Sequence, residues 1–240
     1  MSGEIALIGM AGRFPGAPDL ASYWELLREG GEGLTRLDRD ELLMAGVDPA
    51  VLADPRYVSA AGALDAIDRF DAAFWGIGAG EAALMDPQTR IALETTWHAL
   101  EDAAIDPRRF DGAIGVFFGA AISTYLLFRL RDRISGPSAP SQLLAMIGND
   151  KDYIATQLAY RLDLRGPAIA VQTACSSSLV AVHLACQSLN AGECDIAIAG
   201  GVSVRVPHRV GYLHEAGGML STDGHCRSFA HGADGTVFAS

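Results

Sequence analysis

The sequence predicts an α/β protein built around a layered, mostly parallel mixed sheet. Short apolar runs lie at 5–8, 113–119, 168–171 and 195–199, and runs of this length are typical of strands that are buried on both faces. The stretches between them carry apolar residues at helical spacing, and glycine or proline marks many of their ends. Because strands that alternate with helices form βαβ units, we expect helices on both faces of the sheet, in an α/β/α arrangement.

The N-terminal part should contain one strand, one capped helix and an irregular connection. The run at 5–8 is expected to be a strand buried on both faces. The glycine-rich loop at 9–16 has neither GxGxxG spacing nor a P-loop lysine, so it does not indicate a nucleotide site. Asp19 is a suitable N-cap for the helix that follows. Gly-Gly and Asp-Pro pairs make 30–72 an irregular surface connection with short helical pieces.

Two further helices are marked by their first residues. Asp86 followed by Pro87 combines a favoured N-cap with a favoured first helical residue, and apolar spacing continues beyond it. A turn rich in glycine, proline and serine at 135–140 comes before another helix, which opens over 149–156. A charged, capped first turn accounts better than catalysis for Lys151 and Asp152 in this segment.

The segment VQTACSSSLVAVH at 171–183 combines a strand, a sharp turn and a helix around Cys175. A breaker at 165–167 precedes it, and apolar residues then recur every three or four positions up to Leu189. At a helix start, unpaired N–H groups and the helix dipole stabilise a thiolate and can hold an oxyanion on a thioester carbonyl. Cys175 is therefore a candidate nucleophile. The alternative is a small buried hydrophobe, the usual role of a free cysteine.

Composition and charge argue against several classes of function. Half of the 240 residues are hydrophobic, a fifth are charged, and the net charge is −11. Nucleic acid is therefore not expected as a partner, since phosphate binding needs a basic face. We expect neither a secretory signal nor a membrane span. Four cysteines without a CxxC pair and six scattered histidines provide no metal site or disulfide framework, which favours a cytoplasmic protein with reduced thiols.

Several ordered segments together resemble the β-ketoacyl synthases, the condensing enzymes of fatty-acid and polyketide assembly. The likeness is greatest to ketosynthase domains of modular polyketide synthases, and it covers nearly the whole chain. It implies a thiolase-like fold, with residues 1–240 forming the N-terminal half of a ketosynthase domain whose C-terminal half is absent. The segments that carry the resemblance are GMAGRFPG at 9–16, MDPQTR at 85–90, STYLL at 123–127, the Cys175 segment at 171–183, the strand and glycine pair at 195–204, and STDGHCRSF at 221–229.

The resemblance implies acyl transfer by Cys175. In the family, the active-site cysteine takes an acyl chain from a thioester on the phosphopantetheine of an acyl carrier protein, so no cofactor is bound directly. A malonyl-type thioester then loses carbon dioxide and the resulting carbanion attacks the acyl-cysteine. The resemblance also implies two partners besides the carrier protein, which are the missing C-terminal half and a second copy that pairs at a sheet edge.

The histidines that assist decarboxylation in the family lie in HGTGT and KSNIGH-like motifs, and neither motif occurs in this chain. None of the six histidines present has either context. His183 lies eight residues after Cys175, which is about 12 Å along a helix and too far to contact the sulfur. Acyl loading on Cys175 without a complete condensation is therefore the expected chemistry.

Three departures from the family pattern occur. Gly78-Ala79-Gly80 replaces a serine, a proline and an arginine, Gln157 stands where arginine is frequent, and His231 with Gly232 lies where acidic residues are usual. The first departure puts any contact of the missing arginine in doubt, though not the fold.

Two other functions remain open. The chain could be a scaffold that binds a carrier protein or dimerises without turnover, which the missing histidine motifs favour and the intact Cys175 segment opposes. A decarboxylase or chain-length-factor relative is a variant of this idea, but such relatives usually replace the cysteine. An unrelated cysteine hydrolase would need a histidine partner for the thiol, and the order of the segments opposes it.

Overall fold

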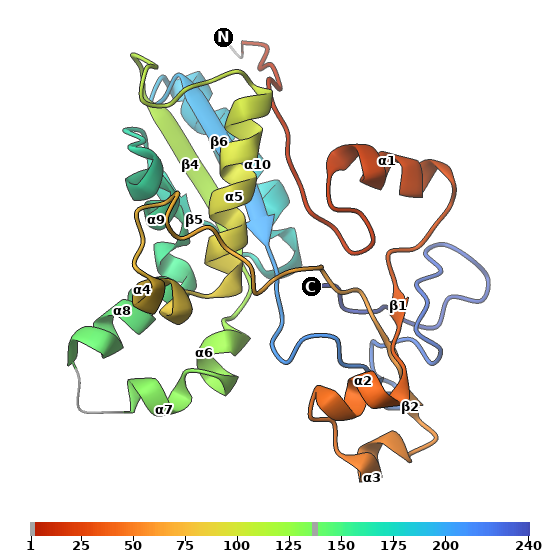
Figure 1. Cartoon of the computed structure of the whole chain (residues 1–240). Coiled ribbons are helices and arrows are strands. Elements are labelled where there is room, and N and C mark those ends of the chain that lie inside the picture. Colours follow the sequence, from red (N-terminus) through yellow and green to blue (C-terminus); the bar gives the residue numbers. More distant parts are fainter. Residues whose placement is uncertain (1–2, 136–138) are drawn as a thin grey trace. The chain divides into compact units, whose positions relative to one another are not determined.

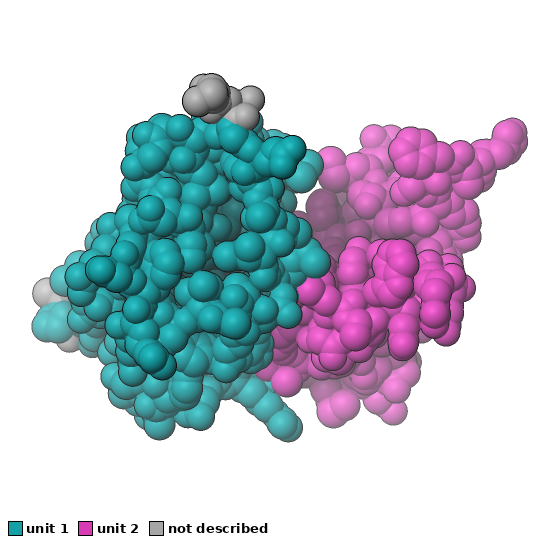
Figure 2. Space-filling view, turned by 90° about the horizontal axis from the view of Figure 1, so that it is seen from above, with its two compact units in different colours: residues 1–11, 67–204 teal, residues 12–66, 205–240 magenta. Residues whose placement is uncertain are grey.

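The computed structural model describes residues 3–135 and 139–240. The chain divides into two compact units, which we call unit 1 (residues 1–11 and 67–204) and unit 2 (residues 12–66 and 205–240). Figure 2 shows unit 1 in teal and unit 2 in magenta. None of the helices among the described residues is both long and apolar enough to cross a membrane.

Unit 1 holds the larger sheet and most of the helices (Figure 1). Its elements, in chain order, are α4 (Ala79–Leu84), α5 (Pro87–Asp102), β4 (Ile114–Ala120), α6 (Thr124–Phe128), α7 (Arg131–Ile134), α8 (Ala139–Asn149), the 3₁₀ turn η1 (Lys151–Tyr153), α9 (Ile154–Leu162), β5 (Ala168–Ala170), the 3₁₀ turn η2 (Ala174–Ser176), α10 (Ser177–Ala191) and β6 (Ile196–Val202).

The sheet of unit 1 is fully parallel, with the strand order β5-β4-β6. Strand β4 pairs with β6 over its whole length, from Ile114 opposite Ile196 to Ala120 opposite Val202. The chain reaches β5 from β4 through α6 to α9, and it reaches β6 from β5 through α10. Three of the four expected strands are thus confirmed, and helices follow β4 and β5 as the alternating pattern predicts, whereas β6 leads into the loops of 203–240 and the short strand Tyr212–Leu213.

Helices cover both faces of this sheet, so the expected α/β/α layering is confirmed. Val116 and Phe118 of β4 lie in one apolar core with residues of α5 and α9. Phe117 points to the other face, where it packs with Ala181 and Ala185 of α10. Successive residues of a strand point to opposite faces, which is why neighbouring residues of β4 belong to different cores. Figure 1 shows α5 running along the sheet.

The expected strand at 5–8 is wrong. These residues form no β-ladder with any described residue. Ile5, Leu7 and Ile8 are 42%, 76% and 51% exposed. An apolar run becomes a buried strand only where a neighbouring strand takes up its N–H and C=O groups and a second layer covers it. Neither is provided by the described part of this chain, so the run stays exposed.

Two other segments differ from expectation. The stretch 123–127, which the family resemblance implies is a loop after a strand, contains helix α6, because Ser123 caps it by accepting a hydrogen bond from Leu126 N at 3.1 Å. The turn expected at 135–140 lies partly outside the described residues, at 136–138, and α8 already begins at Ala139. The caps at Asp19 and Asp86 are confirmed, since each accepts a backbone N–H of its helix.

Unit 2 is made of short elements joined by loops, as the turn-rich sequence predicts for 30–72. Two small antiparallel pairs, β1 with β3 and β2 with β7, hold it together. Its elements are α1 (Leu20–Arg28), β1 (Thr35–Arg36), α2 (Arg39–Met44), α3 (Pro49–Leu52), β2 (Tyr57–Val58), β3 (Ala60–Ala61) and β7 (Tyr212–Leu213).

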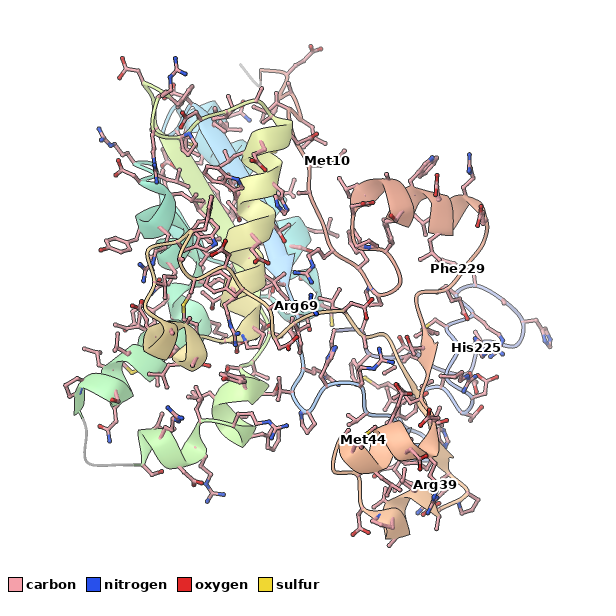
Figure 3. All side chains as sticks on the ribbon, in the orientation of Figure 1. Met10, Arg39, Met44, Arg69, His225 and Phe229 are labelled. Atoms are coloured by element: carbon pink, nitrogen blue, oxygen red, sulfur yellow. The ribbon has the colours of Figure 1, made fainter. Side chains whose placement is uncertain are left out.

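A polar network crosslinks the C-terminal loops of unit 2 to its N-terminal part. His225, labelled in Figure 3, lies 2.5 Å from Glu32 through Nδ1 and 3.0 Å from Arg36 through Nε2. Arg36 also donates to the carbonyl of Asp223. The Asp223 carboxylate receives two hydrogen bonds from Arg227, at 3.1 and 2.7 Å. The Arg227 guanidinium lowers the pKa of Asp223, with further help from hydrogen bonds of Ser221 and His225.

This network predicts acid-induced loosening of the loop at 221–227. Because the folded-state pKa of Asp223 is lowered, its pairing stabilises the fold above the unfolded pKa of about 3.9 and is lost as the pH falls below it. We expect exchange of the His225 amide, whose N–H donates to the Asp223 carboxylate, to accelerate beyond its intrinsic change once the pH falls below about 4. Arg227→Gln should remove most of that difference, whereas Arg56→Gln, at the separate Asp54 pair, should not. Equal behaviour of both variants would contradict the assignment.

Candidate functional site

Cys175 lies in the connection between β5 and α10, within the 3₁₀ turn η2. Helix α10 begins two residues later, at Ser177. The cysteine is exposed, so it is not a buried hydrophobe. The local order of strand, turn and helix is the one that the sequence predicts. The thiol therefore faces solvent beside the amino end of a 15-residue helix, where the helix dipole favours negative charge.

Two serine side chains brace the turn from within. Ser176 Oγ donates to Thr173 O at 2.8 Å and lies 3.0 Å from Thr173 Oγ1. Ser177 Oγ donates to Ala174 O at 2.8 Å and accepts from Thr173 N at 2.9 Å. Ser176 occupies the N-cap position of α10 but makes no capping hydrogen bond to the helix. Both hydroxyl groups thus hydrogen-bond within the turn. Ser176 does not cap the first N–H groups of α10.

The residue before the cysteine has an unusual backbone conformation. Ala174 has φ of 54°, in the left-handed region that residues other than glycine seldom enter. Such a conformation costs on the order of 1–3 kcal/mol and persists only where its surroundings enforce it. Thr173, Ser176 and Ser177 provide that enforcement through the hydrogen bonds described above. The sequence offers no signal for this feature, because alanine normally avoids the left-handed region.

The first turn of α10 rests directly on backbone of the sheet. Gly119 of β4 lies opposite Gly201 of β6. A Cβ added at Gly119 would lie 2.7 Å from Ser177 Cβ and 3.0 Å from Val171 O, and one at Gly201 would lie 3.1 Å from Ser178 Cβ. Glycine at both positions therefore allows α10 to start close above the strand ends. At Gly201 the absence of a side chain thus lets the start of α10 approach β6 closely.

Gly119→Ala should destabilise the protein by about 1–3 kcal/mol, the usual cost of adding a methyl group to a tightly packed position. The new methyl group would push Ser177 and the first turn of α10 away from β4. Gly80→Ala is a matched control, because its Cβ meets nothing within 4 Å and alanine favours a helix over glycine by about 1 kcal/mol. Urea unfolding measures both. If Gly119→Ala were as stable as the parent chain, the close packing of α10 against Gly119 would be refuted.

The other residues considered at this site are less closely placed. Lys151 Nζ lies 3.5 Å from Gln172 Oε1, near the Cys175 turn, but both side chains are exposed. Asp150 caps η1 by accepting from Asp152 N at 3.1 Å, which confirms a capped first turn. His183 is exposed on α10 and is a poor candidate for a base. Gly78 precedes α4 without a side-chain cap, so the helix forms despite the departure at 78–80.

A buried polar cluster, which the sequence did not single out as functional, lies at the carboxyl ends of β4 and β6. Asp86 and Gln88, at the start of α5, are each 2% exposed. Burial raises the pKa of the Asp86 carboxyl, and hydrogen bonds from Ser123 and Gln88 together with the charge of Arg90 oppose the rise. The carboxyl ends of β4, β5 and β6 lie at one edge of the parallel sheet, which is also the edge from which the Cys175 turn leaves.

Taken together, the described residues form a layered α/β unit that presents an exposed cysteine at a strand-to-helix turn. Over residues 2–240 the sequence matches the family described as β-ketoacyl synthase, N-terminal domain. The chain belongs to this family. The resemblance to condensing enzymes that the sequence motifs indicated is thus confirmed.

The relatives are modular polyketide synthases. The chain is 53% identical over 243 residues to a phenolphthiocerol/phthiocerol polyketide synthase of Mycobacterium tuberculosis, covering 98% of this chain and 16% of that protein. It is 42% identical over 240 residues to erythronolide synthase EryA3 of Saccharopolyspora erythraea, covering 96% of this chain and 7% of that protein. The chain thus spans less than a fifth of the length of these relatives.

Solved ketosynthases have the same fold. Ketosynthase twelve of the bacillaene polyketide synthase from Bacillus amyloliquefaciens superposes with a TM-score of 0.86 at 32% identity, over 97% of this chain and 40% of that chain. The module 6 ketosynthase of the bacillaene synthase from Bacillus subtilis 168 gives 0.75 at 35% identity, over 97% and 37%. The predicted thiolase-like ketosynthase fold is therefore confirmed.

Proposed function

We propose that the chain is the N-terminal half of a polyketide ketosynthase domain and that Cys175 is its acyl acceptor. The Cys175 thiolate would attack the carbonyl of an acyl thioester carried on the phosphopantetheine arm of an acyl carrier protein. A new carbon–sulfur bond forms at Cys175, and the phosphopantetheine thiolate leaves and takes up the proton that the Cys175 thiol released. The observation that carries the proposal is the exposed position of Cys175 two residues before α10.

The geometry of the turn supports acyl transfer over a structural role. An exposed thiol on a braced, strained turn costs folding energy without contributing to a core, whereas a nucleophile needs that placement. The N–H groups at the start of α10 are suited to stabilise the oxyanion of a tetrahedral intermediate on Cys175. The small side chains on both sides of the cysteine, Ala174 and Ser176, leave room for a thioester.

The condensation that would follow acyl loading needs residues that this chain lacks. Neither family histidine motif occurs in the sequence, so we propose that the C-terminal half supplies the decarboxylating histidines. Exposed apolar residues support the presence of a surface on this chain that the C-terminal half would cover. In unit 1, Leu179 and Val182 of α10 are 75% and 48% exposed. Apolar side chains gathered on a surface usually mark contact with another chain or segment.

Dimer formation and location follow from the same proposal. Strand β5 lies at an edge of the described sheet, and an unpaired edge can pair with a second copy. Ile169 of β5 is 45% exposed, which suits such an interface. We further propose that the protein works in the cytoplasm, where its four cysteines stay reduced.

The test is acyl transfer to the 240-residue chain. Incubation with an acyl carrier protein that bears an acyl thioester should add one acyl group at Cys175, detected by intact-mass and peptide mass spectrometry. Incubation with a malonyl thioester should release no carbon dioxide. The alternative, a scaffold that binds a carrier protein without turnover, predicts complex formation with no adduct. Carbon dioxide release by this chain alone would overturn the proposal that the C-terminal half supplies the decarboxylating histidines.

A further inference from the structure

Gln88 makes an unusual set of contacts for a residue in the first turn of a helix. Its Oε1 accepts from Ala121 N at 3.1 Å and from Val204 N at 3.4 Å. Its Nε2 donates to Ala121 O at 3.2 Å and to Asp86 Oδ2 at 3.3 Å. A carboxamide offers two N–H donors and two acceptor lone pairs, so this side chain uses its full capacity while 2% exposed.

The partners of Gln88 are the points at which two strands end. Ala121 directly follows β4, and Val204 lies two residues after β6. Ala121 N also donates to Val202 O at 3.1 Å, so the last rung of the β4–β6 ladder and the Gln88 amide share one N–H group. Just beyond the last backbone hydrogen bond between β4 and β6, the Gln88 carboxamide thus links the two strands where they begin to separate.

These strand ends are the support of the Cys175 turn. The opposed glycines Gly119 and Gly201, close to the ends of β4 and β6, lie so near Ser177 and Ser178 of α10 that an added Cβ would come within 2.7 and 3.1 Å of these serines. Val171, the residue after β5, donates its N–H to Phe118 O at 2.9 Å. The position of Cys175 relative to the sheet therefore depends on how β4 and β6 are spaced where they end.

We propose that Gln88 is a positioning residue for Cys175. Its carboxamide holds the ends of β4 and β6 at the spacing that seats the first turn of α10, and it does so from α5, on the opposite face of the sheet from α10. The effect of Gln88 on catalysis rests on the proposed role of Cys175. The bracing of β4 and β6 by Gln88 rests on the hydrogen bonds alone. Gln88 does not contact the thiol and takes no part in the chemical step.

The test compares three variants of the 240-residue chain. Gln88→Met keeps the length and volume of the side chain but removes every hydrogen bond. Gln88→Glu keeps the acceptor for Ala121 N and Val204 N and loses the donors to Ala121 O and to Asp86 Oδ2. Ser188→Ala is the control, because Ser188 is buried and its side chain donates a part-buried hydrogen bond to Glu193 near the other end of α10.

Two measurements are made on each variant. The first is the rate constant for alkylation of Cys175 by iodoacetamide, with the exposed Cys226 as internal reference. The second is amide hydrogen exchange across residues 177–180. We expect Gln88→Met to slow Cys175 on the order of 10-fold to 100-fold, as small misplacements of reacting groups do, and to speed exchange at 177–180. Gln88→Glu should lie between it and the parent chain, and Ser188→Ala should match the parent chain in both.

The outcomes separate the two proposals. Unchanged alkylation and unchanged exchange in Gln88→Met would overturn the positioning role, as would an equal loss in Ser188→Ala. If Cys175 of the parent chain reacts no faster than Cys226 while Gln88→Met still speeds exchange at 177–180, the positioning role stands and the nucleophile assignment fails. Should Gln88→Met not fold, the Gln88→Glu variant decides by the same two measurements.

Discussion

Replacing Cys175 by alanine is expected to abolish both acyl loading and selective alkylation of the chain. Three other cysteines remain, of which Cys194 is buried and Cys186 is partly buried. Loss of a nucleophile costs on the order of 10⁶-fold in turnover in well-studied hydrolases, so any residual adduct should be at background level. Iodoacetamide or cerulenin followed by peptide mass spectrometry measures the labelling of each cysteine.

The matched control for this variant is Cys226→Ala. Cys226 is exposed like Cys175, but its sulfur accepts a hydrogen bond from Val237 N at 3.1 Å and it precedes no helix. We expect Cys226→Ala to load acyl groups as the parent chain does. Slow and equal labelling of Cys175 and Cys226 in the parent chain would instead favour the scaffold function over acyl transfer.

Phe117→Ala is expected to cost about 3–5 kcal/mol of stability, the range for deleting a buried aromatic side chain. Phe117 is 1% exposed and fills the core between β4 and α10, against Val171, Ala181 and Ala185. A domain has only about 5–15 kcal/mol of stability in total, so this loss is a large share. It also removes the support beneath the helix that follows Cys175.

Phe128→Ala provides the comparison, because Phe128 is 64% exposed in α6. A surface substitution of this kind usually changes stability by less than about 0.5 kcal/mol. Thermal unfolding followed by circular dichroism should lower the midpoint of Phe117→Ala by about 10 °C, at 2–4 °C per kcal/mol for a chain of this size. Similar midpoints for the two variants would show that Phe117 does not hold the core together.

The sequence determined the features that are encoded by neighbouring residues. The strand, turn and helix around Cys175, the caps at Asp19 and Asp86, and the strands β4 and β6 all follow from spacing and capping chemistry within short segments. Local hydrogen bonds and the alternation of buried side chains are sufficient to specify them. The ordered motifs then identified the family, which the match over 2–240 confirms.

Other features could only be decided by residues that are distant in the chain. The run at 5–8 has the composition of a buried strand but remains exposed, because a strand also requires a partner, and no described residue pairs with it. Alanine disfavours the left-handed backbone conformation of Ala174, and hydrogen bonds of neighbouring residues hold it in that conformation. The Gln88 contacts join residues 33 and 116 positions away. Such long-range contacts form only once the sheet and its two helical layers have been assembled, so they leave no local pattern to read.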